Sequence, residues 1–170
     1  MLPDMAEITL RGNPIHTNGD LPAEGSPVPD FTLTKSDWTP VGAADLAGQR
    51  VVLNIFPSID TPTCQTSVRT FNERAADLEN TMVLCVSADL PPAAARFCGA
   101  EGIENVATGS TFKNPDVLDS LGVRMVDGLL EGLAARAVVV LDTDGTVLHS
   151  QLVPEIAAEP DYDAAIAALG

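Results

Sequence analysis

The feature that most limits the possible folds of this chain is a strand, a short turn and a helix that follow one another between residues 51 and 78. Val51 to Phe56 is a nearly continuous apolar run, typical of a strand buried on both faces. Met82 to Val86 is a second such run. Between the two, apolar side chains recur at helical spacing, at Val68, Phe71, Ala75 and Leu78. This order predicts a βαβ unit with parallel strands and a right-handed crossover.

The turn before the helix leads into a single thiol, Cys64. A helix start exposes unpaired backbone N–H groups and the positive end of the helix dipole, which together favour a thiolate. Thr61 lies one turn earlier, so its hydroxyl can donate a hydrogen bond to the sulfur. In open α/β folds this junction is at the sheet edge where ligands bind. Cys64 is therefore a candidate nucleophile, and the alternative is an ordinary turn with an incidental cysteine.

The charge and hydropathy of the chain exclude several classes of function. It has 24 acidic and 9 basic residues, and its formal net charge is -15. This charge argues against nucleic acid and anionic membranes as partners. No stretch approaches an apolar membrane span, and the N-terminus lacks the pattern of a signal peptide. We therefore expect an unexported, cytoplasmic protein.

The three cysteines of the chain have different sequence surroundings. They are too few for a disulfide scaffold and lack the spacing of a zinc site, so we expect no bound metal. In a reducing cytoplasm such cysteines are either buried and inert or redox-active. Cys85 lies in the middle of the second apolar run, where cysteine packs as a small apolar side chain. Cys98 lies near a predicted helix end, because Gly99 follows it.

The rest of the chain predicts short elements around the βαβ unit. Residues 7–10 and 15–17 flank a Gly- and Pro-containing turn, which is typical of a hairpin. Asp144-Gly145 between two β-rich runs predicts a second, antiparallel hairpin. The other expected elements are strands at 31–34, 137–141 and 147–152, a brief edge strand at 106–108, and helices at 91–98, 114–121 and from about 161.

This order of elements predicts the fold class. We expect one α/β domain over residues 1–170, thioredoxin-like, with a central mixed β-sheet flanked by helices. Residues 1–19 would form an N-terminal β-hairpin that extends this domain.

Several segments resemble the thiol peroxidase branch of the peroxiredoxin family, and the resemblance covers nearly the whole chain. Pro57, Thr61 and Cys64 match the P-x-x-x-T-x-x-C pattern of peroxiredoxins. Four segments resemble the thiol peroxidase branch in particular, and they span residues 56–61, 87–91, 96–102 and 132–140.

The resemblance implies a role for each matching residue. It makes Cys64 the peroxidatic cysteine, Cys98 the resolving cysteine and Arg136 the active-site arginine, with Thr61 and Pro57 completing the site. The implied enzyme is a thioredoxin-dependent peroxidase that reduces hydrogen peroxide and organic hydroperoxides. It would pass through a sulfenic acid and an internal Cys64–Cys98 disulfide. The family further implies a homodimer and no metal, haem or flavin cofactor.

Two other functions are compatible with parts of this pattern. A general thiol-disulfide oxidoreductase would share the fold, but Thr61 occupies the position of the partner thiol in a C-x-x-C pair. A non-catalytic redox sensor or adaptor, which relays oxidation to a partner protein, would have the same sequence features as the peroxidase. Only kinetics separate the sensor from the enzyme.

Overall fold

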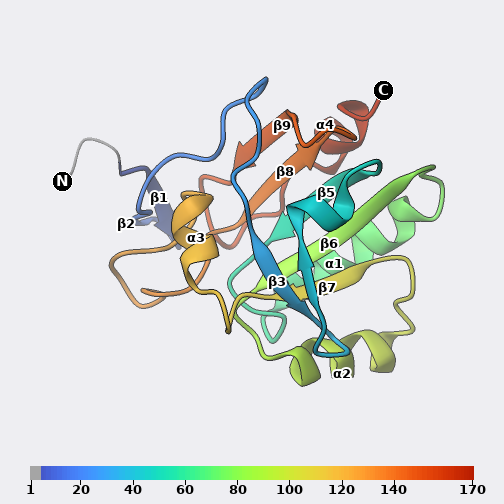
Figure 1. Cartoon of the computed structure of the whole chain (residues 1–170). Coiled ribbons are helices and arrows are strands. Elements are labelled where there is room, and N and C mark those ends of the chain that lie inside the picture. The colour runs from blue at the N-terminus through green and yellow to red at the C-terminus, as the bar shows by residue number, and fades with distance from the viewer. Residues whose placement is uncertain (1–4) are drawn as a thin grey trace.

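Seven strands pair into one mixed sheet in this computed structural model, which describes residues 5–170 (Figure 1). The central pairs β5–β6 and β6–β7 are parallel, whereas the outer pairs are antiparallel. The parallel centre confirms the predicted βαβ unit and the predicted fold class. Across the sheet the order is β4 (Pro40–Gly42), β3 (Thr32–Lys35), β7 (Ala107–Ser110), β6 (Thr81–Ser87), β5 (Arg50–Ile55), β8 (Ala137–Leu141) and β9 (Val147–Leu152).

Different helices cover the two faces of the sheet. Successive side chains of a strand point to opposite faces, so Leu53 and Val52 belong to separate apolar clusters. Helix α3 packs on the face of Leu53, and α1, α2 and α4 pack on the face of Val52. Figure 1 shows α3 and α1 on opposite sides of the sheet. The helices are α1 (Pro62–Ala75), α2 (Pro91–Glu101), α3 (Asp116–Ser120) and α4 (Tyr162–Ala167), with a short 3-10 helix η1 (Ala43–Leu46).

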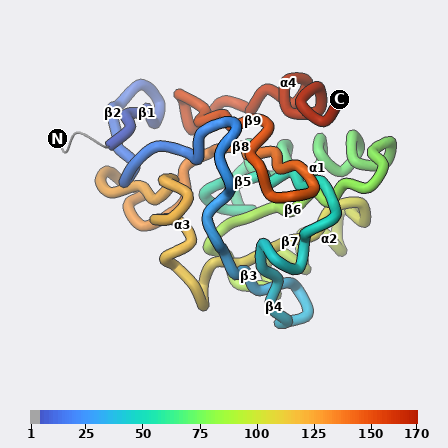
Figure 2. The backbone as a smooth tube through the Cα atoms, turned by 45° about the horizontal axis from the view of Figure 1, so that its top comes forward, coloured from blue at the N-terminus to red at the C-terminus, as the bar shows by residue number. Residues whose placement is uncertain are grey.

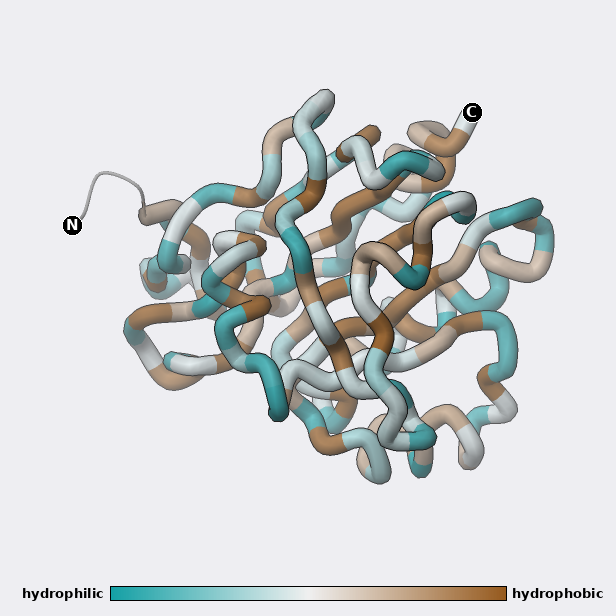
Figure 3. The backbone as a smooth tube through the Cα atoms, in the orientation of Figure 1, coloured by the Kyte–Doolittle hydropathy of each residue, from teal (hydrophilic) through white to brown (hydrophobic). Residues whose placement is uncertain are grey.

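The apolar residues of the chain are concentrated along the central strands, and the outer loops are more hydrophilic (Figure 3). All five residues of β8 are buried, as are the last five of β5. Among residues 5–170, no helix is both long and apolar enough to cross a bilayer.

A two-stranded hairpin, β1 (Glu7–Leu10) and β2 (Asn13–His16), lies outside the main sheet. Its buried Ile8 and Ile15 pack with Met125, Ala135 and Ile156 in a third, smaller apolar cluster. Figure 2 shows the hairpin beside the loop that precedes β8. The predicted N-terminal hairpin is therefore confirmed, and it packs against the segments on either side of the β8–β9 hairpin.

Several predicted boundaries and pairings differ from the structure. Helix α2 does not end before Gly99 but continues to Glu101, because Gly102 adopts the left-handed φ of 65° that closes the helix. Strand β7 is not an edge strand, since β3 pairs along its outer side. The sequence reasoning also missed β4, a three-residue strand that pairs with β3.

Gly122 is required at the end of α3, and this requirement can be measured. Its φ is +72°, and a Cβ there would lie 2.0 Å from the carbonyl oxygen of Asp20. Gly102 has a similar φ of +65° but open space around it. We expect Gly122→Ala to lower the free energy of unfolding by more than about 3 kcal/mol and Gly102→Ala by about 1 kcal/mol. Chemical denaturation of both variants tests this, and equal losses would contradict it.

Candidate active site

Cys64 is the third residue of helix α1, directly after the turn that leaves β5. Thr61 caps the helix in an extended conformation, with φ -119° and ψ 146°, and Pro62 follows as the first helical residue. Pro62 is favourable there because the first N–H groups of a helix have no intrahelical acceptor. The predicted strand-turn-helix placement of the thiol is therefore confirmed.

Arg136 makes the side-chain contact that distinguishes this thiol. Arg136 directly precedes β8, and only 2% of its surface is exposed. Its Nη2 lies 3.4 Å from Cys64 Sγ, and its Nε donates a hydrogen bond of 2.9 Å to the carbonyl oxygen of Ile156. Its Nη1 has no hydrogen-bond partner among residues 5–170. A buried guanidinium thus faces the sulfur with one donor still available.

Asp89 fixes the turn that precedes Cys64. Its carboxylate accepts hydrogen bonds from the Ser58 hydroxyl at 2.8 Å and the Ile59 backbone N–H at 2.7 Å. The Ser87 hydroxyl donates to the same carboxylate at 2.7 Å. Asp89 lies just after β6, so it ties the turn after β5 to the neighbouring strand. Charge-assisted bonds of this kind hold a loop more firmly than neutral ones.

Thr61 and Pro57 occupy the predicted site, but the Thr61 hydroxyl makes a different bond from the one expected. It donates to the carbonyl oxygen of Ser58 at 2.8 Å rather than to Cys64 Sγ. The reason is local, because a threonine at a helix N-terminus readily bonds backbone groups three residues away. Pro57 is buried and, with Thr61 and Arg136, lines a cavity of about 710 Å³.

This cavity lies between the active-site turn and the N-terminal hairpin. Its walls are mostly apolar and come from β1, β2 and the loop before β8, with Leu10, Ile15, Leu130 and Leu133 among them. Its volume is in the usual range for small-molecule sites. The hairpin that lies outside the main sheet therefore has a functional position, as one wall of this cavity.

Cys64 itself lies beneath the cavity. No part of its surface is exposed, and it belongs to the apolar cluster under α1. Cys64 does not line the cavity, but its neighbours Thr61, Thr63 and Arg136 are among the residues that do. A small molecule in the cavity therefore contacts the sulfur only if these side chains move.

The other two cysteines occupy different environments on the same face of the sheet. Cys85 is buried in β6, and burial raises the pKa of its thiol to about 12. Cys98 lies in the last turn of α2 and is half-buried, and burial also raises the pKa of its thiol. Both thiols therefore stay protonated at neutral pH in these positions. All three cysteines are free.

Residues 5–170 contain no group of three or more His, Cys, Asp or Glu side chains arranged to hold a metal ion. The arrangement described above consists of a thiol, a guanidinium and a nearby cavity.

Comparison with known proteins shows the family of the chain. The Redoxin family model matches residues 23–166. The thiol peroxidase of Mycobacterium tuberculosis is 57% identical over 166 residues, which cover 98% of this chain and 99% of that protein. A peroxiredoxin-like protein from Aquifex aeolicus superposes with a TM-score of 0.90 at 37% identity, covering 96% of each chain.

The chain belongs to the peroxiredoxin family, in its thiol peroxidase branch. The peroxiredoxin fold also relates it to the thiol peroxidase of Chromobacterium violaceum, with a TM-score of 0.88 over 96% of this chain and 94% of that one, at 19% identity. As a member of this branch, the peroxiredoxin described here is a peroxidase.

Three further residues of the site were not predicted from the sequence. Asp89 lies in a segment that resembles the thiol peroxidase branch, but nothing in the sequence indicated that its carboxylate would hold the turn before Cys64. Ser67 lies one turn after Cys64 and donates a hydrogen bond of 2.8 Å to its carbonyl oxygen. Asn54 of β5 donates in turn to the Ser67 hydroxyl at 3.2 Å. Asn54 is a polar residue within an apolar run, and this feature of the sequence could have indicated the second network.

The ion pair that secures the cavity wall depends on pH. His16 Nδ1 lies 2.7 Å from Asp127 Oδ2, which joins β2 to the loop before β8. The hydrogen bond to Asp127 raises the pKa of His16 above 6.5, and hydrogen bonds from His16 lower the pKa of Asp127 below 3.8. The stabilisation by His16 is complete below pH 6.5 and is lost as the pH rises through its raised pKa. The stabilisation by Asp127 is present above pH 3.8 and is lost as the pH falls through its lowered pKa.

We therefore expect Asp127→Asn to destabilise the peroxiredoxin most between pH 3.8 and 6.5, with a smaller difference from wild type in alkaline solution. Denaturation across pH measures this difference. Glu24→Gln is the matched control, because Glu24 lies 4.0 Å from His149 and makes no hydrogen bond with it. A difference for Asp127→Asn that does not change with pH would contradict the expectation.

Proposed function

We propose that this peroxiredoxin reduces hydrogen peroxide and organic hydroperoxides with Cys64 as the peroxidatic residue. The thiolate of Cys64 attacks one peroxide oxygen and the O–O bond breaks. The sulfur becomes a sulfenic acid, and the other oxygen leaves as water or an alcohol after it takes up a proton. The single observation that carries this proposal is the contact between the buried Arg136 guanidinium and Cys64 Sγ.

Arg136 is placed to assist both reactants of this step, the thiolate and the peroxide. Its Nη2 provides a counter-charge 3.4 Å from the sulfur, and its Nη1, which is unpaired within residues 5–170, is available to a peroxide oxygen. A donor that is already in place and excluded from water stabilises developing negative charge without reorganisation. Thr61 and Pro57 line the cavity beside it and would restrict access of bulk water to the reacting atoms.

The cavity supports organic hydroperoxides as substrates alongside hydrogen peroxide. Its volume of about 710 Å³ far exceeds what hydrogen peroxide needs, and leucine, isoleucine and proline side chains line much of it. An alkyl group placed there would bury apolar surface while the peroxide group faces Arg136.

Cys98 is proposed as the resolving cysteine. Its thiol would attack the sulfenic sulfur of Cys64, release water and form an internal disulfide. Several contacts hold α2 against α1 and would have to open first. Arg69 of α1 pairs with Glu101 and lies 5.4 Å from the ring centre of Phe97, next to Cys98. Departure from the apolar cluster would also remove the burial that raises the Cys98 pKa.

Thioredoxin is the proposed reductant, and it would reduce the disulfide by thiol-disulfide exchange. We also propose that this peroxiredoxin forms a homodimer and that it is located in the cytoplasm.

Intact-mass analysis after one equivalent of peroxide tests the cysteine roles. We expect wild type to lose two hydrogens through an internal disulfide and Cys98→Ser to gain oxygen or link between chains. Cys85→Ser is the matched control and should behave as wild type, because Cys85 is buried in β6. Normal disulfide formation in Cys64→Ser would contradict the assignment.

Turnover separates an enzyme from a non-catalytic redox sensor. With thioredoxin and its reductase supplied, we expect many equivalents of peroxide to be consumed for each Cys64, and we expect Arg136→Ala to lose about two to three orders of magnitude in the rate of attack. Following NADPH consumption measures the turnover. A single oxidation without turnover would favour the sensor.

A further inference from the structure

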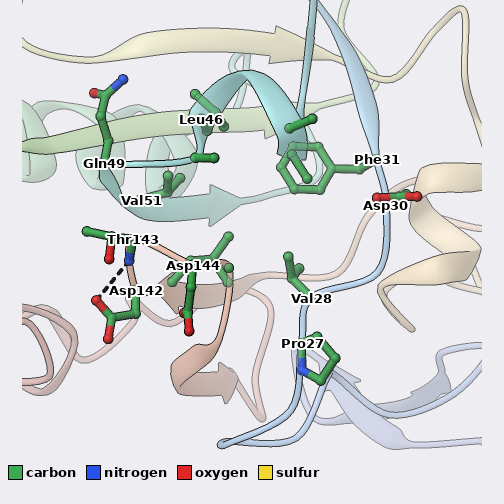
Figure 4. A pocket seen from close by; sticks show the side chains of 15 residues that line it. Pro27, Val28, Asp30, Phe31, Leu46, Gln49, Val51, Asp142, Thr143 and Asp144 are labelled. Carbon is green, nitrogen blue, oxygen red and sulfur yellow. Dashed lines mark hydrogen bonds between the residues drawn. The ribbon is translucent and has the colours of Figure 1, made fainter.

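The cavity beside Cys64 differs in charge from the rest of the molecule. The chain has a net charge of -15, yet no acidic residue lines this cavity, and Arg11 and Arg136 both do. A second cavity of about 230 Å³ provides a comparison, because Asp30, Asp142 and Asp144 line it without any basic residue (Figure 4). Of these two cavities in residues 5–170, only the one at the active site has a lining that attracts anions.

Arg11 is placed by the turn of the hairpin. It connects β1 to β2 with a φ of 51°, a left-handed conformation that is uncommon for arginine and is followed by Gly12 with a φ of 81°. Within residues 5–170 its guanidinium makes no ion pair and its side chain donates no hydrogen bond. By contrast, Arg69, Arg74 and Arg124 each pair with a carboxylate. Arg11 therefore places a positive charge at the cavity, and no carboxylate of residues 5–170 pairs with this charge.

One anion beside this turn, Glu155, is already bound by other donors. Glu155 accepts hydrogen bonds from the backbone N–H groups of Gly12 and Ala157, at 2.9 and 2.8 Å, and from the Thr9 hydroxyl at 3.0 Å. These bonds lower the pKa of Glu155 to about 2, so it is a carboxylate throughout the neutral range. Its oxygens thus face the backbone of the hairpin turn rather than the guanidinium of Arg11.

We propose that Arg11 binds the carboxylate of hydroperoxides derived from fatty acids, and so selects anionic over neutral substrates of similar shape. This inference rests on the proposed function. The peroxide group would face Arg136, the alkyl chain would lie along the apolar wall, and the carboxylate would reach Arg11 at the hairpin turn. An arginine suits this role, because its planar fork of N–H donors matches a carboxylate.

A matched pair of substrates tests the proposal. The value of kcat/KM is measured for a medium-chain hydroperoxy fatty acid and for its methyl ester, below the concentration at which either aggregates. Hydrogen peroxide is the third substrate. The variant is Arg11→Asn, because asparagine tolerates the left-handed φ of this position and the hairpin should remain folded. Lys113→Asn removes the same charge from an exposed residue outside the cavity.

We expect wild type to prefer the acid over the ester, and Arg11→Asn to lower kcat/KM for the acid by about three- to fivefold. Its values for the ester and for hydrogen peroxide should not change. High salt should reduce the preference in wild type and have no such effect in Arg11→Asn. Lys113→Asn should behave as wild type.

An equal acid-to-ester ratio in wild type and Arg11→Asn would overturn the role of Arg11, while activity with hydrogen peroxide would leave the proposed peroxidase intact. Equal losses with all three substrates in Arg11→Asn would also overturn it, because they would indicate damage to the hairpin rather than recognition of an anion. Absence of activity with every peroxide in wild type would instead contradict the proposed function.

Discussion

The contact between Arg136 and Cys64 is the interaction on which the rest of the site depends. Removing a guanidinium from water costs several kcal/mol unless partners offset the loss. Here a single carbonyl oxygen, that of Ile156, and the sulfur are the only hydrogen-bond partners in residues 5–170. The fold thus holds a buried positive charge that is only partly neutralised by its own residues. A thiolate at the sulfur would neutralise this charge, and a peroxide oxygen at Nη1 would supply the missing hydrogen-bond acceptor.

Contacts on both sides hold the Arg136 guanidinium and the Cys64 sulfur in place relative to each other. Asp89 holds the turn before Cys64, and the Ser67 hydroxyl holds the carbonyl oxygen of Cys64 from within α1. Ile156 fixes the guanidinium by its backbone, and the same residue packs with Ile8 and Ile15 of the hairpin. The cavity wall and Arg136 therefore share a support. A change in the packing of the hairpin would be expected to affect the position of Arg136 as well as the shape of the cavity.

Local patterns made part of this site predictable. The strand-turn-helix around Cys64 and the first strand of the hairpin follow from short-range periodicity, and both were found where expected. The end of α2 was misplaced because Gly99 looked like a stop, whereas the helix closes at Gly102, where the Ile103 N–H bonds the Cys98 carbonyl oxygen. The burial of Arg136 and the role of Asp89 depend on contacts between residues far apart in the sequence. No local pattern encodes such contacts, and only the resemblance to a family pointed to Arg136.

The end of α2 at Glu101 determines what the proposed attack of Cys98 on Cys64 would cost. A cysteine at a frayed helix end could move at little cost. Cys98 instead lies within the last turn, and its carbonyl oxygen accepts the bond that closes the helix. Its movement toward Cys64 would therefore break the helix cap as well as the contacts of Arg69 with α2. Cys85 has no comparable freedom, because it is paired on both sides within the sheet. The difference between the two cysteines thus comes from their elements, since the last turn of a helix can unwind alone and a central strand cannot.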